Sequence, residues 1–151
     1  MKFPSLLVVA CLMAPLPAVA QDVVPDATVV VAAEGLAPEE QPALADLLWV
    51  ARPLVIFADN TNDPRFAQQM QMLEERPTDL ADRDVVILTD TDPAARGPLR
   101  QELRPRGFGI VLIDRDGSIV QRRPNPTTAR EIINLIDRLP SRRQETGSRR
   151  Q

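Results

Sequence analysis

The side chains with most potential for chemistry lie in two short polar segments, each directly after an apolar run. One segment follows residues 54–58 and the other follows residues 85–88. If both runs are neighbouring parallel strands, their carboxyl ends share one edge of the sheet, where ligand sites usually form. Carboxylate and amide oxygens are the ligands that Ca²⁺ and Mg²⁺ prefer. The sequence therefore predicts a candidate ligand or cation site made of Asp59, Asn60, Asn62, Asp63, Asp90 and Asp92.

A purely local explanation accounts for the same residues. Asp63 precedes Pro64, a pair typical of a helix N-cap followed by proline at the first helical position. Asp90 and Asp92 precede Pro93, and aspartate and asparagine form turns by bonding to their own backbone. Under this explanation the acidic segments are caps and turns that bind nothing, and both explanations stay open.

Four arginines are candidate anion contacts. Arg104 and Arg106 precede the apolar run 108–113 and return to the same edge of the sheet. Arg142 and Arg143 belong to a basic tail that could touch phosphate-rich partners such as anionic lipid or lipopolysaccharide. A short like-charged tail is also typical of a solvated, disordered end.

The amino terminus has the pattern of a secretory signal peptide over residues 1–20. A basic start at Lys2 precedes an apolar run, and Ala18 and Ala20 give a small-x-small cleavage site. We expect cleavage after Ala20, a periplasmic or secreted protein, and no transmembrane helix in what remains, because the run is too short to span a bilayer. Cys11 also fits a loose lipobox, but that alternative leaves only ten residues of signal.

The residue types that are missing exclude several classes of enzyme. The chain has no histidine or tyrosine, and its single cysteine and single lysine lie inside the predicted signal. The mature chain therefore has no Ser-His-Asp triad, no cysteine nucleophile and no Schiff-base lysine, and thiol-dependent redox activity is excluded. What remains is carboxylate chemistry, an oxygen-ligated cation such as Ca²⁺ or Mg²⁺, or no catalysis. We expect no other cofactor.

The mature charge also limits the partners. Residues 21–151 carry 17 arginines against 21 acidic residues. That balance argues against non-specific binding of nucleic acid by the whole surface.

The apolar patterns predict one α/β domain at residues 47–140. Strands are expected at residues 54–58, 85–88, 108–113 and 118–122, and helices at residues 64–74, 98–104 and 129–139. This is the β-α-β-α-β-β-α order of a thioredoxin-like core, with a mixed sheet of four or five strands. Residues 21–46 are a lead-in with a possible extra strand at 28–32, and residues 141–151 are expected to be a disordered basic tail. Trp49, in the apolar turn 44–50, is expected to supply packing area in the core or in a lid.

The chain resembles the domain of unknown function 4174 family, which occurs in exported bacterial proteins and some vertebrate extracellular matrix proteins. The resemblance spans residues 47–145. It is carried by Trp49, the segment 52–58, Asp63-Pro64-Arg65, the segment 80–85, Asp116-Gly117, Ile136-Asp137, Leu139-Pro140, Arg142-Arg143 and Glu145. It implies a thioredoxin- or peroxiredoxin-like domain and assigns no biochemical function.

These observations lead to two functional hypotheses. The first is a non-catalytic, exported, thioredoxin-like module that binds a protein or an envelope component. The alternative is a carboxylate-based cation-binding protein or hydrolytic enzyme that uses the acidic segments at the sheet edge.

Overall fold

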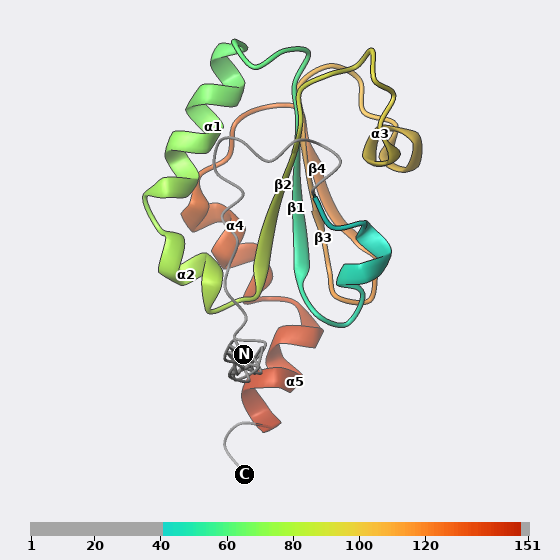
Figure 1. Ribbon diagram of the computed structural model, residues 1–151. Helices are drawn as coiled ribbons and strands as arrows, with labels where there is room; N and C mark the ends of the chain where they lie inside the picture. Colours follow the sequence, from blue (N-terminus) through green and yellow to red (C-terminus); the bar gives the residue numbers. More distant parts are fainter. Residues whose placement is uncertain (1–40, 149–151) are drawn as a thin grey trace, which may run out of the picture.

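The computed structural model describes residues 41–148, which form a four-stranded mixed sheet with helices on both faces (Figure 1). The strands lie in the order β2-β1-β3-β4. They are β1 (Arg52–Phe57), β2 (Val85–Asp90), β3 (Gly109–Ile113) and β4 (Ile119–Arg123). The helices are η2 (Leu44–Leu47, a 3₁₀ helix), α1 (Pro64–Glu74), α2 (Pro77–Ala81), α3 (Pro98–Leu103), α4 (Ala129–Ile136) and α5 (Pro140–Ser148).

The strand directions confirm the predicted topology. β1 and β2 are parallel and are joined through α1 and α2, as a crossover connection requires. β3 runs antiparallel to β1, and the tight turn after β3 makes β4 antiparallel to β3. Leu54 in the middle of β1 pairs with Ile87 on one side and with Leu112 on the other. β1 is thus the central strand, which explains its continuous run of buried residues.

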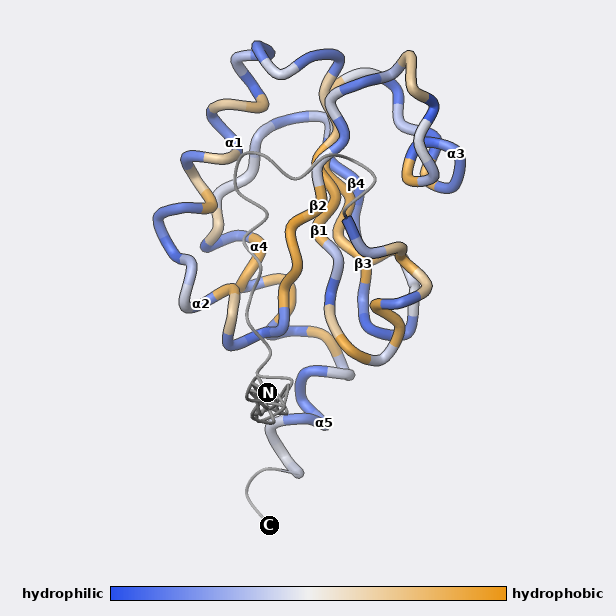
Figure 2. Tube along the Cα trace, in the orientation of Figure 1, coloured by the Kyte–Doolittle hydropathy of each residue, from blue (hydrophilic) through white to orange (hydrophobic). Residues whose placement is uncertain are grey.

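The two faces of the sheet carry separate apolar clusters. α1, α2 and α4 cover one face, where Leu54, Ile56 and Ile136 are buried. η2 and α3 cover the other face, over Val55 and Phe57. Figure 2 shows that hydrophobic residues concentrate in the sheet, while the helices around it carry many hydrophilic residues. Alternate residues of β1 therefore pack into two separate apolar clusters, one on each face of the sheet.

Two features differ from the sequence-based expectations. Residues 141–148, predicted to belong to a disordered tail, instead continue α5, which lies beyond the end of the sheet (Figure 1). The short helix α2 was not predicted at all. The signal peptide and the possible strand at 28–32 lie outside the described residues, so both remain predictions. Within residues 41–148 no helix is long and apolar enough to cross a membrane.

Candidate functional site

Two of the predicted acidic side chains at the carboxyl edge are each held by an arginine. Asp63 caps α1 by accepting the backbone N–H of Arg65 at 2.9 Å, and its other oxygen accepts from Nη2 of Arg65 at 2.9 Å. The hydrogen bonds from the Arg65 guanidinium hold the pKa of Asp63 below its usual value. Asp90 accepts from Nε of Arg100 at 2.8 Å, and Arg100 also donates to the carbonyl of Ala58. Both carboxylates therefore already have a cationic partner.

The other four predicted residues are exposed, and two of them, Asn60 and Asp92, accept hydrogen bonds within local turns. Asn60 accepts the backbone N–H of Asn62 at 2.9 Å, and Asp92 accepts that of Ala94 at 2.9 Å. Asp59 is exposed beside Gly107. Within residues 41–148 no three acidic, histidine or cysteine side chains come together as a metal site would require. The structure places the six residues on one edge without gathering them, and cation binding stays a prediction.

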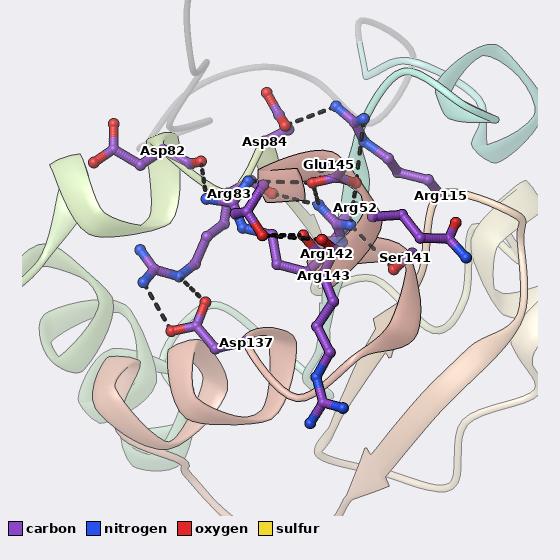
Figure 3. Close-up of polar contacts among 12 residues, drawn as sticks. Arg52, Asp82, Arg83, Asp84, Arg115, Asp137, Ser141, Arg142, Arg143 and Glu145 are labelled. Carbon is purple, nitrogen blue, oxygen red and sulfur yellow. Dashed lines mark hydrogen bonds and ion pairs between the residues drawn. The ribbon is translucent and has the colours of Figure 1, made fainter. Parts of the chain in front are cut away.

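The four candidate anion contacts fall into two groups. Arg104 and Arg106 are exposed on the approach to β3, and no acidic side chain of residues 41–148 pairs with either one. Arg142 instead forms an ion pair with Glu145 at 3.1 Å, and its Nη2 donates to the carbonyl of Asp82 at 2.9 Å. Arg143 points away from these contacts (Figure 3). Anion binding by these arginines likewise remains a prediction.

A fully buried arginine lies at the opposite end of the sheet, where the sequence predicted no site. Arg52, the first residue of β1, is 0% exposed. Its Nε donates to Asp114 at 3.0 Å, Nη1 to the carbonyl of Arg83 at 3.0 Å, and Nη2 to Ser141 at 3.2 Å. Both terminal nitrogens also donate to Glu145 (Figure 3). All five guanidinium donors thus have acceptors, which offsets much of the cost of burying the charge.

We call this set the Arg52 network, and it also contains four further ion pairs, one of which is the pair of Arg142 with Glu145 described above. Arg115 bonds to Asp84 at 2.7 Å and to Glu145 at 3.3 Å. Arg83 bonds to Asp137 at 2.8 Å. α5 has no fully buried residue, and hydrogen bonds of Ser141, Arg142 and Glu145 join it to the domain. The members are Arg52, Arg83, Asp84, Asp114, Arg115, Asp137, Ser141, Arg142 and Glu145. All of them except Asp114 are labelled in Figure 3.

The network makes stability depend on the ionisation of Glu145. Burial raises the pKa of Glu145, but hydrogen bonds from Arg52 and Arg142 outweigh it and leave the pKa below the ordinary value of 4.5. Because the folded pKa is depressed, Glu145 contributes stability above pH 4.5 and loses that contribution as the pH falls through its folded pKa. Glu145→Gln should therefore cost most near neutral pH and progressively less in acid.

Denaturant unfolding at a series of pH values measures this difference in free energy. Glu74→Gln is the matched control, because Glu74 is exposed at the end of α1. The control should give a small difference at every pH. A Glu145→Gln cost that does not change with pH would contradict the account.

The only tryptophan of the chain lies on the surface, contrary to the expectation that it would supply packing area. Trp49 is 74% exposed, in the loop that joins η2 to β1. Leu48, Val50 and Ile119 are also exposed, and these are the large exposed hydrophobic residues of the described chain. Leu48, Trp49 and Val50 are consecutive in the chain. Ile119 belongs to the hairpin against which their loop packs. We call Leu48, Trp49, Val50 and Ile119 the Trp49 surface.

The loop is fixed in place by the β3–β4 turn. The N–H of Trp49 donates to the carbonyl of Arg115 at 2.7 Å, and the Arg115 guanidinium donates to the carbonyl of Val50 at 3.1 Å. Leu48 packs on Gly117, whose φ of +83° and lack of a Cβ permit both the turn and this contact. Since Arg115 also bonds to Glu145, the Arg52 network supports the loop.

Trp49 itself has a left-handed backbone with a φ of 64°. This conformation costs a side-chain-bearing residue about 1–2 kcal/mol relative to the right-handed one. The hydrogen bonds of the loop hold the residue there and direct the indole into solvent. No pattern in the sequence signals a positive φ at a tryptophan, so sequence reasoning missed this surface.

A cavity of about 250 Å³ opens beside the Trp49 surface, between η2, α3 and the β3–β4 turn. Apolar side chains make up most of its wall, and Leu48 and Ile119 belong to both the cavity and the Trp49 surface. The lining residues are Leu44, Ala45, Leu47, Leu48, Pro53, Glu102, Leu103, Ile113, Asp114, Gly117 and Ile119. We call this space the η2–α3 cavity.

The arrangement of the strands and helices is that of the thioredoxin fold. A reduced 2-Cys peroxiredoxin of Plasmodium vivax matches with a TM-score of 0.54 at 14% identity, over 71% of this chain and 90% of the other. Prx1a of Plasmodium yoelii matches with a TM-score of 0.52 at 15% identity, over 71% of this chain and 85% of the other. At such low identity these likenesses show the fold alone.

The family is shown by the sequence. Residues 43–145 match the family described as "Domain of unknown function (DUF4174)", and the chain belongs to that family. The matched region extends through Glu145 and so includes the part of α5 that contacts Arg52. No curated protein matches the sequence significantly.

Proposed function

We propose that this protein is an exported, non-catalytic binding module that engages a protein partner through the Trp49 surface. The observation that carries the proposal is the backbone of Trp49, which is held in an unfavourable conformation while its side chain stays in water. Strain of this kind persists only where surrounding contacts enforce it, and it concentrates at functional positions. Packing gives no reason for it here, because the indole packs against little.

The chemistry of the surface suits a protein partner. Exposed apolar residues that cluster on a soluble domain mark interaction sites. Tryptophan is among the residues that contribute most energy at interfaces, because it supplies a large rigid contact area. The loop is already ordered by its bonds to Arg115, so binding would cost little additional ordering.

The thioredoxin-like scaffold supports binding more than catalysis. The loop after β1, where redox cysteines lie in thioredoxin-like proteins, holds Asp59 and Asp63 and no thiol. Asp63 at this edge is paired with Arg65, and Asp90 with Arg100. A carboxylate that accepts hydrogen bonds from a cation is a weaker base than a free carboxylate.

Affinity capture tests the proposal. The immobilised mature chain is compared with a variant that carries Leu48→Ser, Val50→Ser and Ile119→Ser. The matched control carries Ala67→Ser, Gln68→Ser and Gln71→Ser on the exposed side of α1. We expect a discrete envelope protein to be retained by the native chain and the control and lost by the first variant. Equal retention by all three, or turnover of a substrate without a partner, would contradict it.

The alternative, cation binding by the acidic segments, makes a separate prediction. Binding to the native state adds about 2.7 kcal/mol of stability when the free cation is at a hundred times its Kd, and it must therefore raise the melting temperature. The ion pairs of Asp63 and Asp90 lead us to expect no shift when Ca²⁺ or Mg²⁺ is titrated to millimolar concentration. Thermal unfolding followed by circular dichroism measures this. A saturable rise that Asp59→Ala and Asp90→Ala abolish would support the alternative instead.

A further inference from the structure

We infer that the η2–α3 cavity receives an apolar side chain from a partner segment that also carries lysine or arginine. This inference rests on the proposed function and specifies the chemistry of the partner. It follows from three properties of the cavity: its size, its apolar wall and the charge on its rim.

The size suits a side chain. Pockets for drug-sized ligands usually measure about 300–1,000 Å³, and this cavity measures about 250 Å³. The wall is formed mainly by leucine, isoleucine, alanine and proline side chains. Leu47, Leu103 and Ile113 form its floor and are buried in the core below. An aliphatic or aromatic side chain would complete the packing, while Trp49 and Val50 would contact the backbone on either side.

The rim is acidic. Glu102 lines the cavity, Asp46 lies in η2 between two lining residues, and Asp116 immediately precedes the lining residue Gly117. All three are exposed, and no arginine of residues 41–148 forms an ion pair with any of them. Asp46 accepts the backbone N–H of Ala43 at 3.3 Å, and Asp116 accepts that of Ser118 at 2.8 Å. Arg122 donates to the carbonyl of the lining residue Leu103 at 2.7 Å.

This charge selects among the possible occupants. Residues 21–43 of the chain itself carry five acidic residues and no basic one, so they cannot complement the rim. An anionic lipid or a phosphate would be repelled for the same reason. A segment with lysine or arginine beside its apolar anchor matches both the wall and the rim, and its charges would speed association and weaken with added salt.

Fluorescence of Trp49, the single tryptophan, reports occupancy directly. The mature chain is titrated with three sets of short peptides that share one apolar centre of leucine and isoleucine and lack tryptophan. The flanks are lysine in the first set, glutamate in the second and serine in the third. We expect lysine-flanked peptides to bind at least about tenfold more tightly than glutamate-flanked ones at low salt. This preference should shrink at high salt as the charges are screened.

Two charge-reversal variants locate the effect. Glu102→Lys with Asp46→Lys should reverse the preference. The matched control, Glu74→Lys with Glu75→Lys, changes the net charge equally at the end of α1 and should keep it. Both variants are checked for a native circular dichroism spectrum, and Glu102→Lys alone serves if the double variant is unfolded.

Three results would overturn the inference: equal binding of all sets, preference for glutamate flanks, or no binding of any set. Self-association of the chain that buries Trp49 without a peptide preference would also overturn it, in favour of a second copy as occupant. Each of these could coexist with specific capture of a partner through the Trp49 surface. Failure here is therefore distinguishable from failure of the proposed function.

Discussion

Replacing Arg52 with alanine should destabilise the fold by about 3–5 kcal/mol, the cost of removing one partner from a buried ion pair. The substitution removes all five hydrogen bonds of the guanidinium and leaves Asp114 and Glu145 without their central counter-charge. It should also release α5, because Arg52 donates three hydrogen bonds to that helix, which has no fully buried residue. Urea unfolding measures the loss, and faster amide exchange in α5 reports its release.

Two further variants test the explanation. Arg52→Lys keeps the charge but loses the planar fork that reaches several acceptors at once, so it should cost less than alanine but still destabilise. Arg76→Ala is the matched control, because the ion pair of Arg76 with Asp79 at 3.1 Å is exposed. Exposed pairs contribute about 0–1 kcal/mol. A loss for Arg52→Ala no larger than that of Arg76→Ala would show that the Arg52 network does not stabilise the domain.

Replacing Trp49 with glycine should weaken binding of the partner without lowering the stability of the fold. Glycine relieves a left-handed strain of about 1–2 kcal/mol. Its greater freedom in the unfolded chain offsets about 0.5–1 kcal/mol of that gain. Since the indole is mostly in water, we expect the free energy of unfolding to stay unchanged or to rise slightly. Affinity for the captured partner should fall by at least about 2 kcal/mol, or roughly 30-fold, as loss of a central interface tryptophan does.

Arg96→Gly is the matched control, because Arg96 is also exposed with a positive φ of 49° but lies in the loop after β2. It should change stability in the same direction and leave affinity unaltered. Chemical denaturation and a binding titration with the captured protein measure the two effects. If Trp49→Gly binds as well as the native chain, or unfolds the domain, the surface tryptophan has a structural role instead.

The fold could be predicted because its signals are local and agree with one another. The apolar run that became β1 had no polar interruption from Leu54 to Ala58, and such a run is typical of a strand buried on both faces. Thr128 and Glu131 form the predicted capping box at the start of α4. The Asp116-Gly117 turn made the last two strands antiparallel. Each of these signals depends on residues close together in the chain.

The site could be predicted only in part, because its important contacts join distant residues. Arg52 reaches Ser141 and Glu145 across some ninety positions. No local pattern indicates that Ser141 and Glu145, in a basic tail, accept hydrogen bonds from a buried arginine. The same distance explains why residues 141–148 were expected to be disordered: they have no apolar face, and their order comes from partners elsewhere. Asp63 and Asp90 were placed on the correct edge, but their pairing with Arg65 and Arg100 was not predicted.

The most direct test of the central claim is site-specific photocrosslinking in cells that produce the full chain. A photoreactive amino acid replaces Val50 in the Trp49 surface, and in a parallel strain it replaces Asp92, which is also exposed but lies at the opposite end of the sheet. We expect a discrete crosslinked protein at position 50 that is absent at position 92 and disappears with Trp49→Gly. No product at position 50, or the same product at both positions, would contradict the claim that this surface binds a protein partner.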